Sequence, residues 1–500
     1  MKNCFVVIVG WVFSTTVAFA QTMSYEEFKK QQNQEYKSYT TENQRKYDEY
    51  RRKLNDQYAE FMKKNWESFS AKPAVDVKPV TPVVPIVCPD PEPTPQPVPV
   101  PEDKPNPKPI PVQPDVLELP KPKPQPQPLA DVKPKEDLPY SKYSISFYGA
   151  TLSVGFPKND SFRLNAVSEL EFASAWKTLS ASSYDITLSD VLKIRQDLLL
   201  CDWAYVELVK AISEKKYGVT NEASMMQAYL LAQSGYKIRL AHDNKVLYVL
   251  LASEHGILAR SHYSIDGVKY YPLITTPSSL YISSASFDSE KAMSLLLNHE
   301  QKLNVTPTSP RTLKAKNGVE AHVSVNQNNI DFYNNYPKTY INDDPTTTWM
   351  VYANTPMEKT VINTLYPGLR ESIQGLSQRD AVNKILNFVQ TAFEYGYDDK
   401  IWGGERAFFA AETLYYPYSD CEDRSILFSR LVRDLTQLDV VLLYYPNHLA
   451  TAVAFTQDVD GDYLMYKNKR YVVCDPTFIG AAVGRTMTGM DNQQAKIVVL

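Results

Sequence analysis

The feature that most constrains this chain of 500 residues is a proline tract. Between Pro73 and Pro139 lie 23 of its 35 prolines, and no glycine occurs from Gln21 to Tyr148. Proline fixes φ and lacks an N–H donor, so such a segment can form neither a helix nor a sheet. Without glycine it should be a stiff polyproline-II spacer. We therefore expect the folded part of the protein to follow this tract.

The first 20 residues have the features of a secretory signal. Lys2 supplies a positive charge, residues 5–13 are apolar, and residues 18–20 (AFA) form a small-x-small cleavage motif. The apolar run is too short for a membrane helix, and no later stretch reaches the length of about 18 apolar residues that one needs. We expect cleavage near Ala20 and a periplasmic, secreted or cell-surface protein without a transmembrane segment.

An 11-residue repeat of aromatic residues occupies residues 24–70. One series is Tyr25, Tyr36, Tyr47, Tyr58 and Phe69, and a second is Phe28, Tyr39, Tyr50 and Phe61. Eleven residues make three helical turns, so the repeat predicts a long helix with an aromatic stripe. Two interpretations of the stripe stay open. We prefer self-association or docking on a partner, and the alternative is packing against the distant globular part.

From residue 140 onward the composition is that of a globular protein. Some segments are rich in β-branched and aromatic residues and others have helical periodicity, without a regular βαβ alternation. This mixture predicts an α+β fold. The charge is nearly balanced, with 53 Lys and Arg against 57 Asp and Glu, which argues against a nucleic-acid partner.

Three residues near the C-terminus form the strongest candidate site. Cys421 follows Asp420, a suitable N-cap, at the start of a helix whose free N–H groups favour a thiolate. His448 is the only histidine after residue 322 and opens an apolar strand, where it could accept the thiol proton. Asp475 ends a short strand before Pro476 and could orient the imidazole. Each residue has a plain structural explanation by itself, but their order and spacing favour a nucleophile, a base and its orienter.

Residues 420–423 (DCED) and 475–476 (DP) resemble motifs of the transglutaminase-like superfamily of papain-type thiol enzymes. That superfamily includes bacterial transglutaminase-like cysteine proteinases. The resemblance implies a core helix packed on an antiparallel sheet. It also implies that Cys421 is the nucleophile, His448 the general base and Asp475 its orienter.

This resemblance extends over roughly residues 375–490. Residues 381–395 resemble the helix before the nucleophile, and residues 402–412 resemble the loop before it in the bacterial proteinases. One departure is Ser419-Asp420, where many relatives have a glycine.

The oxyanion of an acyl transfer needs hydrogen-bond donors. The backbone N–H of Cys421 is the natural first donor, and Gln390 or Trp402 is our candidate for the second. The acidic residues beside the cysteine could bind Ca²⁺, but such residues are common at helix N-termini. We therefore expect no metal and no other cofactor.

Residues 202–272 repeat the pattern in a degenerate form. Asn221 takes the place of the nucleophile, Val246 falls near the place of the base, and Pro272 follows the last strand where an acid would be needed. This comparison predicts an inactive transglutaminase-like unit ahead of the active one.

The predicted organisation has five parts. They are a signal (1–20), a helical segment (21–72), a proline-rich linker (73–139), an inactive unit (140–345) and a catalytic unit (346–500). The favoured function is an exported thiol enzyme that acts on amide bonds of a protein or peptide substrate through an acyl-enzyme, with hydrolysis favoured over acyl transfer. The alternative is a non-catalytic binding or assembly module carried on the proline-rich stalk.

Overall fold

The computed structural model describes most of the chain beyond residue 137 and some segments before it. The described residues are 42, 45–46, 48–75, 115–119, 123–130, 132, 138–158, 162–341, 343–344 and 347–500. The predicted signal, the first half of the aromatic repeat and residues 76–114 of the proline tract lie outside them. None of the helices in these ranges is both long and apolar enough to cross a membrane.

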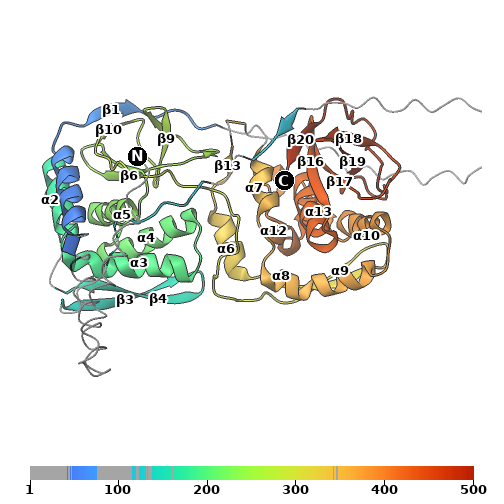
Figure 1. Cartoon of the computed structure of the whole chain (residues 1–500), viewed down its shortest axis with the longest axis horizontal. Coiled ribbons are helices and arrows are strands. Elements are labelled where there is room, and N and C mark those ends of the chain that lie inside the picture. Colours follow the sequence, from blue (N-terminus) through green and yellow to red (C-terminus); the bar gives the residue numbers. More distant parts are fainter. Residues whose placement is uncertain are drawn as a thin grey trace, which may run out of the picture.

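The first of two units consists of a helix pair packed on a six-stranded sheet (Figure 1). The helices are α4 (Asp202–Tyr217) and α5 (Asn221–Gln233). The strands lie in the order β1 (Glu67–Ser70), β10 (Ser279–Ile282), β5 (Ile238–His242), β6 (Leu247–Ala252), β9 (Val268–Pro272) and β8 (Tyr263–Ile265).

The second unit is also built from a helix pair and a six-stranded sheet. Its helices are α10 (Gln378–Thr391) and α13 (Cys421–Thr436). Its six strands lie in the order β2 (Val116–Leu117), β20 (Lys496–Val499), β16 (Asp439–Tyr445), β17 (His448–Ala454), β19 (Lys469–Cys474) and β18 (Tyr463–Tyr466).

The two sheets also share their connectivity. In each, the second helix leads into an antiparallel hairpin, β5–β6 or β16–β17, whose second strand pairs with β9 or β19. A later strand, β10 or β20, returns to the other side of the hairpin. Helix α5 packs on β6, and α13 packs on β17. The predicted α+β class, with helices on mainly antiparallel sheets, is therefore confirmed.

Further elements surround and connect the two units, and α6 lies between them in Figure 1. The first unit adds β3 (Tyr140–Phe147), β4 (Ala150–Pro157), α2 (Glu169–Leu179), a short 3-10 turn (Ser182–Tyr184), α3 (Asp185–Asp197) and β7 (Gly256–Ile257). The connection contains β11 (Arg311–Lys314), β12 (Glu320–Val323), α6 (Gln327–Asn335) and β13 (Thr339–Tyr340). The second unit adds α7 (Thr348–Asn354), α8 (Lys359–Thr364), α9 (Tyr366–Ile373), β14 (Glu394–Tyr395), α11 (Asp398–Ile401), α12 (Ala410–Tyr415) and β15 (Tyr418–Ser419).

Local sequence explains the elements that carry the candidate site. Helix α13 begins with a capping box, in which the backbone N–H of Asp420 donates to Asp423 Oδ2 at 3.3 Å. It ends at Gln437, whose left-handed φ of 59° terminates the helix. The tight turn between β16 and β17 places Asn447 at φ 65°, a conformation that asparagine tolerates better than most residues. The chain reverses after the C-terminal end of α13 and again at this turn, so the start of β17 lies near the start of α13.

The helix before the proline tract packs on the first unit. Over residues 48–62 it buries Tyr58, whose ring stacks on Trp176 and Phe287 with centroid separations of 4.3 and 4.5 Å. Arg51 forms a buried ion pair with Asp185 at 2.5 Å. For this part of the repeat the structure agrees with the alternative interpretation. Tyr58 does not support the preferred interpretation, self-association through this stripe, because Trp176 and Phe287 already cover its ring.

The described ends of the proline tract also join the fold. Strand β1 extends the first sheet, and the carbonyl of Val75 accepts a hydrogen bond from Ala259 N at 3.1 Å. Strand β2 extends the second sheet, and the carbonyl of Asp115 accepts one from Ile497 N at 2.9 Å. The described residues on both sides of the segment 76–114 thus belong to the folded part, one side to each sheet.

A second stretch of the tract, residues 123–130, crosses the first unit. Arg195 donates to the carbonyl of Pro126 at 3.2 Å, and Leu129 N donates to the carbonyl of Gln233. The chain passes so close to Gly235 that a Cβ there would lie 1.9 Å from a backbone oxygen. Proline lacks a donor but keeps its carbonyl, so prolines can bind a folded surface without forming a strand of their own.

Candidate functional site

The three residues predicted to act together lie at one end of the second sheet. Cys421 is the first residue of α13, His448 is the first residue of β17, and Asp475 directly follows β19. All three are buried, with exposed fractions of 5, 2 and 2 %. Because α13 packs on β17 and β17 pairs with β19, the fold brings together residues that are 27 positions apart in each step.

The histidine is bonded on one side only. His448 Nε2 lies 2.8 Å from Asp475 Oδ2, and Asp475 Oδ1 accepts hydrogen bonds from the N–H groups of Thr477 and Phe478. Within the described part of the chain His448 Nδ1 is buried and has no hydrogen-bond partner. A carboxylate on Nε2 favours the tautomer with the proton on that nitrogen. Nδ1 then carries a lone pair that can accept a proton.

Cys421 and His448 line the same small cavity. Trp349, Glu405 and Tyr444 form other parts of its wall. The space inside it that small groups can occupy is about 30 Å³. A small reacting group fits beside the sulfur, whereas Cys421 and His448 are buried too deeply for a peptide main chain to reach them without movement of the wall.

The thiol itself faces an acidic neighbour. Cys421 Sγ donates a hydrogen bond to Glu422 Oε2 at 3.0 Å. Burial, together with the negative charges of Glu422 and Asp420, raises the pKa of the Cys421 thiol well above its ordinary value. In this arrangement the cysteine is a protonated thiol, and the acidic neighbours outweigh the helix N-terminus.

Five carboxylates gather beside the cysteine. They are Asp398, Glu405, Asp420, Glu422 and Asp423, and oxygens of Asp398 lie within 4.8 Å of those of the others in two overlapping groups. Burial raises the pKa of Asp398 to about 7 and that of Glu422 to about 8, and it raises the pKa values of Asp420 and Asp423 well above their usual range. Such a crowd of buried acids is unfavourable without protons or a cation.

These acids could hold a divalent cation such as Ca²⁺. Carboxylate oxygens are the ligands that Ca²⁺ prefers, and Asp420 Oδ1 is buried and accepts no hydrogen bond from any described residue. The buried Arg424 does not bond to them, because its guanidinium donates to the carbonyls of Gln390 and Phe393. The sequence led us to expect no metal, because Asp398 at the start of α11 and Glu405 in the loop after it did not show as part of this cluster.

Gln390, a candidate oxyanion donor, has a different role. Its Nε2 donates to the carbonyls of Asp475, Phe478 and Ala481 at 3.0, 2.8 and 3.1 Å, and its Oε1 accepts from Gly480 N at 3.2 Å. Its side chain is therefore fully used inside the protein. The prediction of an oxyanion donor is wrong here, and Gln390 instead anchors the loop that carries the acid.

Trp402, the other candidate, also lies elsewhere. Its ring packs edge-on against Tyr416, with centroids 4.8 Å apart, and beneath the guanidinium of Arg406. The described residues that line the cavity include Trp349 and Asn447 but not Trp402. Each of these two carries an N–H donor. Asn447 could have been found from its position next to the histidine, whereas Trp349 lies on α7, and no local pattern links it to the cysteine.

The corresponding positions of the first unit carry no acid–base chemistry. Asn221 is the first residue of α5, as the cysteine is of α13. Its side chain bonds the turn before β6, donating to the carbonyl of Lys245 at 3.1 Å and accepting from Leu247 N at 2.9 Å. Leu247, not Val246 as predicted, opens β6, and Leu273 follows β9. Asn221 therefore holds the turn before β6 in place, at the position where the second unit has the cysteine.

Comparisons of the chain with models of protein families, with curated proteins and with solved structures give no match. The function must therefore be argued from the geometry of the site.

Proposed function

We propose that the protein is an exported thiol enzyme of the transglutaminase-like superfamily that hydrolyses amide bonds in proteins or peptides. The observation that carries the proposal is the meeting of Cys421 with the His448–Asp475 pair, bonded at 2.8 Å, in one buried cavity. The order along the chain, the start of a helix followed by a strand start and a strand end, also fits the resemblance noted in the sequence.

The proposed reaction proceeds through a thioester. His448 Nδ1 removes the thiol proton, and the sulfur of Cys421 attacks the amide carbon. As the C–N bond breaks, the imidazolium returns the proton to the leaving amine. His448 then takes a proton from water, whose oxygen attacks the thioester and releases the carboxylic acid and the thiol. Asp475 keeps the imidazole oriented and stabilises its charged form.

Two kinds of donor can stabilise the tetrahedral oxyanion. The N–H of Cys421 lies in the first turn of α13, where backbone N–H groups have no acceptor within the helix. The indole of Trp349 and the amide of Asn447 lie in the wall of the same cavity. One of these side chains would replace the second donor that we had sought in Gln390 or Trp402.

The acidic cluster supports a role for a cation in activation. Asp398 together with either Asp420 and Asp423 or Glu405 and Glu422 would hold the ion, whose positive charge favours a thiolate over a thiol. The Cys421 thiol would then exchange its bond with Glu422 for one with His448.

The test is a comparison of single variants of the full chain. Cys421→Ala and His448→Ala should each lower hydrolysis of an unfolded, dye-labelled protein substrate by about a thousandfold or more. Cys201→Ala is the matched control, because Cys201 is buried in the first unit and should leave activity unchanged. Activity that survives in Cys421→Ala would refute the triad.

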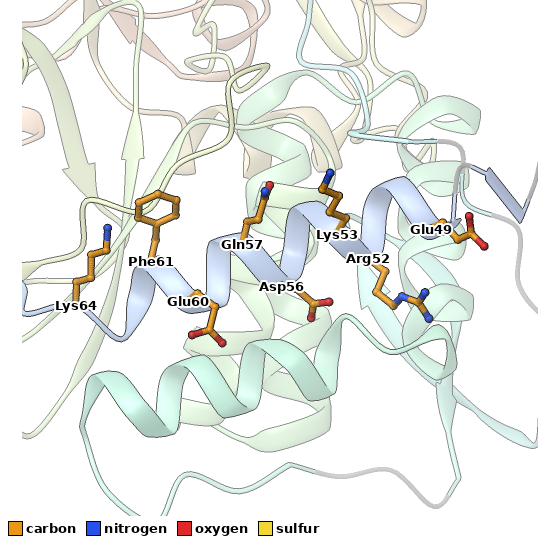
Figure 2. Close-up of a pocket in the computed structure, with 8 residues that line it drawn as sticks. All are labelled: Glu49, Arg52, Lys53, Asp56, Gln57, Glu60, Phe61 and Lys64. Carbon is orange, nitrogen blue, oxygen red and sulfur yellow. The ribbon is translucent and has the colours of Figure 1, made fainter.

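An assembly role has one observation in its favour. Tyr50 and Phe61, which belong to the second aromatic series, are 55 and 48 % exposed. Figure 2 shows Phe61 on the same side of the helix as Lys53 and Lys64, while Glu60 points the other way. This face could pair with a second copy. A Phe61→Ser chain that sediments like the unchanged protein at all concentrations would contradict this role.

A further inference from the structure

A short loop forms part of the wall of the cavity that contains the nucleophile. Glu405 lines the cavity that contains Cys421, and the two glycines before it make this loop easy to move. Gly403 has a φ of 75°, and a Cβ at Gly403 or Gly404 would meet no atom within 4 Å. Because Cys421 is only 5 % exposed and the cavity beside it offers only about 30 Å³, a peptide can reach the sulfur only if part of the wall moves.

The loop is held by the segment that connects the two units. Lys338 Nζ donates a hydrogen bond to the backbone carbonyl of Glu405. The next residue of the loop, Arg406, donates to Asn334 Oδ1 at 2.5 Å. Lys338 also lies in the negative field of Glu405 and Asp398, which opposes the lowering of its pKa by burial. Its charge therefore favours the closed position of the loop.

The first unit fixes this connecting segment in turn. Strand β13 pairs with β7 of the first unit, with Tyr340 opposite Gly256, and Leu258 N donates to the carbonyl of Lys338 at 2.8 Å. The ring of Tyr340 lies on Gly256 so closely that a Cβ there would be 2.0 Å from a ring carbon. The position of Lys338 thus depends on a strand pair that the first unit supplies.

We propose that Lys338 holds the Glu405 loop closed over Cys421, and that the first unit controls access to the nucleophile by fixing Lys338 through β7. The inactive unit then has a defined task, although its own site has lost the reactive residues. The consequence for catalysis rests on the proposed function, whereas the closure of the loop does not. Lys338 is a positioning residue in this scheme and takes no part in the chemistry.

The closure can be measured without a substrate. The rate at which iodoacetamide alkylates Cys421 in the full chain, followed by peptide mass spectrometry, reports how often the loop opens. Lys338→Met keeps the apolar stem and removes the donor, so we expect alkylation to be about tenfold faster, as for the loss of one charge-assisted hydrogen bond. Lys338→Arg keeps a charged donor and should react nearly as the unchanged protein does.

A second variant tests the link to the first unit. Gly256→Ala introduces the Cβ that overlaps Tyr340 and should also accelerate alkylation of Cys421, although residue 256 does not line the cavity. Gly368→Ala is the matched control, because the nearest atom to its Cβ would lie at an ordinary 3.4 Å. If Gly256→Ala fails to fold, the Lys338 variants still decide the closure.

Two results would overturn the inference. One is an unchanged alkylation rate in Lys338→Met. The other is a parallel rise at Cys201 and Cys474, since both are buried and would react only if the whole protein opened. A failure of the proposed function looks different. In that case Cys421→Ala would retain any amide hydrolysis, while the alkylation rates of the Lys338 variants would still respond to the loop.

Discussion

Replacement of Gln390 by methionine tests how the acid of the candidate triad is held. Methionine has nearly the same length and volume as glutamine but can neither donate nor accept these bonds. The change would remove four hydrogen bonds from the loop that follows β19, three to carbonyls and one from a backbone N–H. Because Gln390 is 1 % exposed, water cannot replace these bonds without a rearrangement of the loop.

The expected cost follows from the number of bonds. A hydrogen bond contributes a net of about 1 kcal/mol to stability, and the two amide hydrogens of Gln390 are shared among three carbonyls, so together with the bond to Oε1 we expect a loss of about 3 kcal/mol. Native domains are stable by only about 5–15 kcal/mol, so the loop should loosen measurably. Asp475 begins this loop, and its carbonyl is one of the acceptors. Loss of its position should weaken the bond to His448 and lower kcat more than it raises KM.

Asn383 on the same helix offers a matched control. Its Oδ1 accepts one bond from Val483 N at 2.8 Å, so Asn383→Leu should cost only about 1 kcal/mol in denaturant unfolding. The two variants would be compared by urea unfolding and by the dependence of kcat/KM on pH. Gln390→Met should alter the part of this profile that depends on the protonation of His448. Equal unfolding free energies for the two variants, or an unchanged pH profile, would refute the assigned role of Gln390.

Two further predictions concern the acidic cluster and the N-terminal helix. Because the folded pKa values of Asp398 (about 7) and Glu422 (about 8) are raised, the folded state binds more protons than the unfolded state, and stability should fall as pH rises from about 4.5 to 8. Millimolar Ca²⁺ should flatten this decline in thermal unfolding, and an equal decline with Ca²⁺ and with chelator would argue against a cation. Tyr58→Ala should cost about 3–5 kcal/mol in denaturant unfolding, because its ring is 2 % exposed. The exposed Tyr50→Ala should change stability by less than about 0.5 kcal/mol, and equal effects of the two would contradict the docking of this helix.

Local pattern was sufficient to select the three residues of the candidate site. Cys421 could be recognised because a capping residue and an apolar stripe mark the start of its helix, and His448 because a turn and an apolar run mark the start of its strand. The same reasoning aligns Asn221 with Cys421, and it places Val246 near the position of the base, one residue before Leu247, which opens β6. Boundaries of elements are the least certain part of such predictions, and a turn can shift them by one position.

Long-range contacts lay beyond local pattern. The density of prolines predicts a segment without helix or sheet, and nothing within it shows that Val116 and Leu117 pair with the last strand. Likewise the aromatic repeat predicts a helix, and only the rings of Trp176 and Phe287 show where one of its stripes is buried. An aromatic stripe indicates that the helix packs against another apolar surface, but it does not identify that surface.

The sequence by itself determined the class of the fold, the kind of helix that precedes the proline tract and the three residues on which the proposed chemistry depends. Periodicity, capping and turn preferences act over a few residues and can be read from one chain. Only the tertiary structure decided that Asp398 and Glu405 join the acids beside Cys421, that Gln390 anchors the acid loop, and that Lys338 connects the first unit to the nucleophile. These relations depend on side chains from segments that are distant in the sequence, which meet only when the sheets and helices have packed.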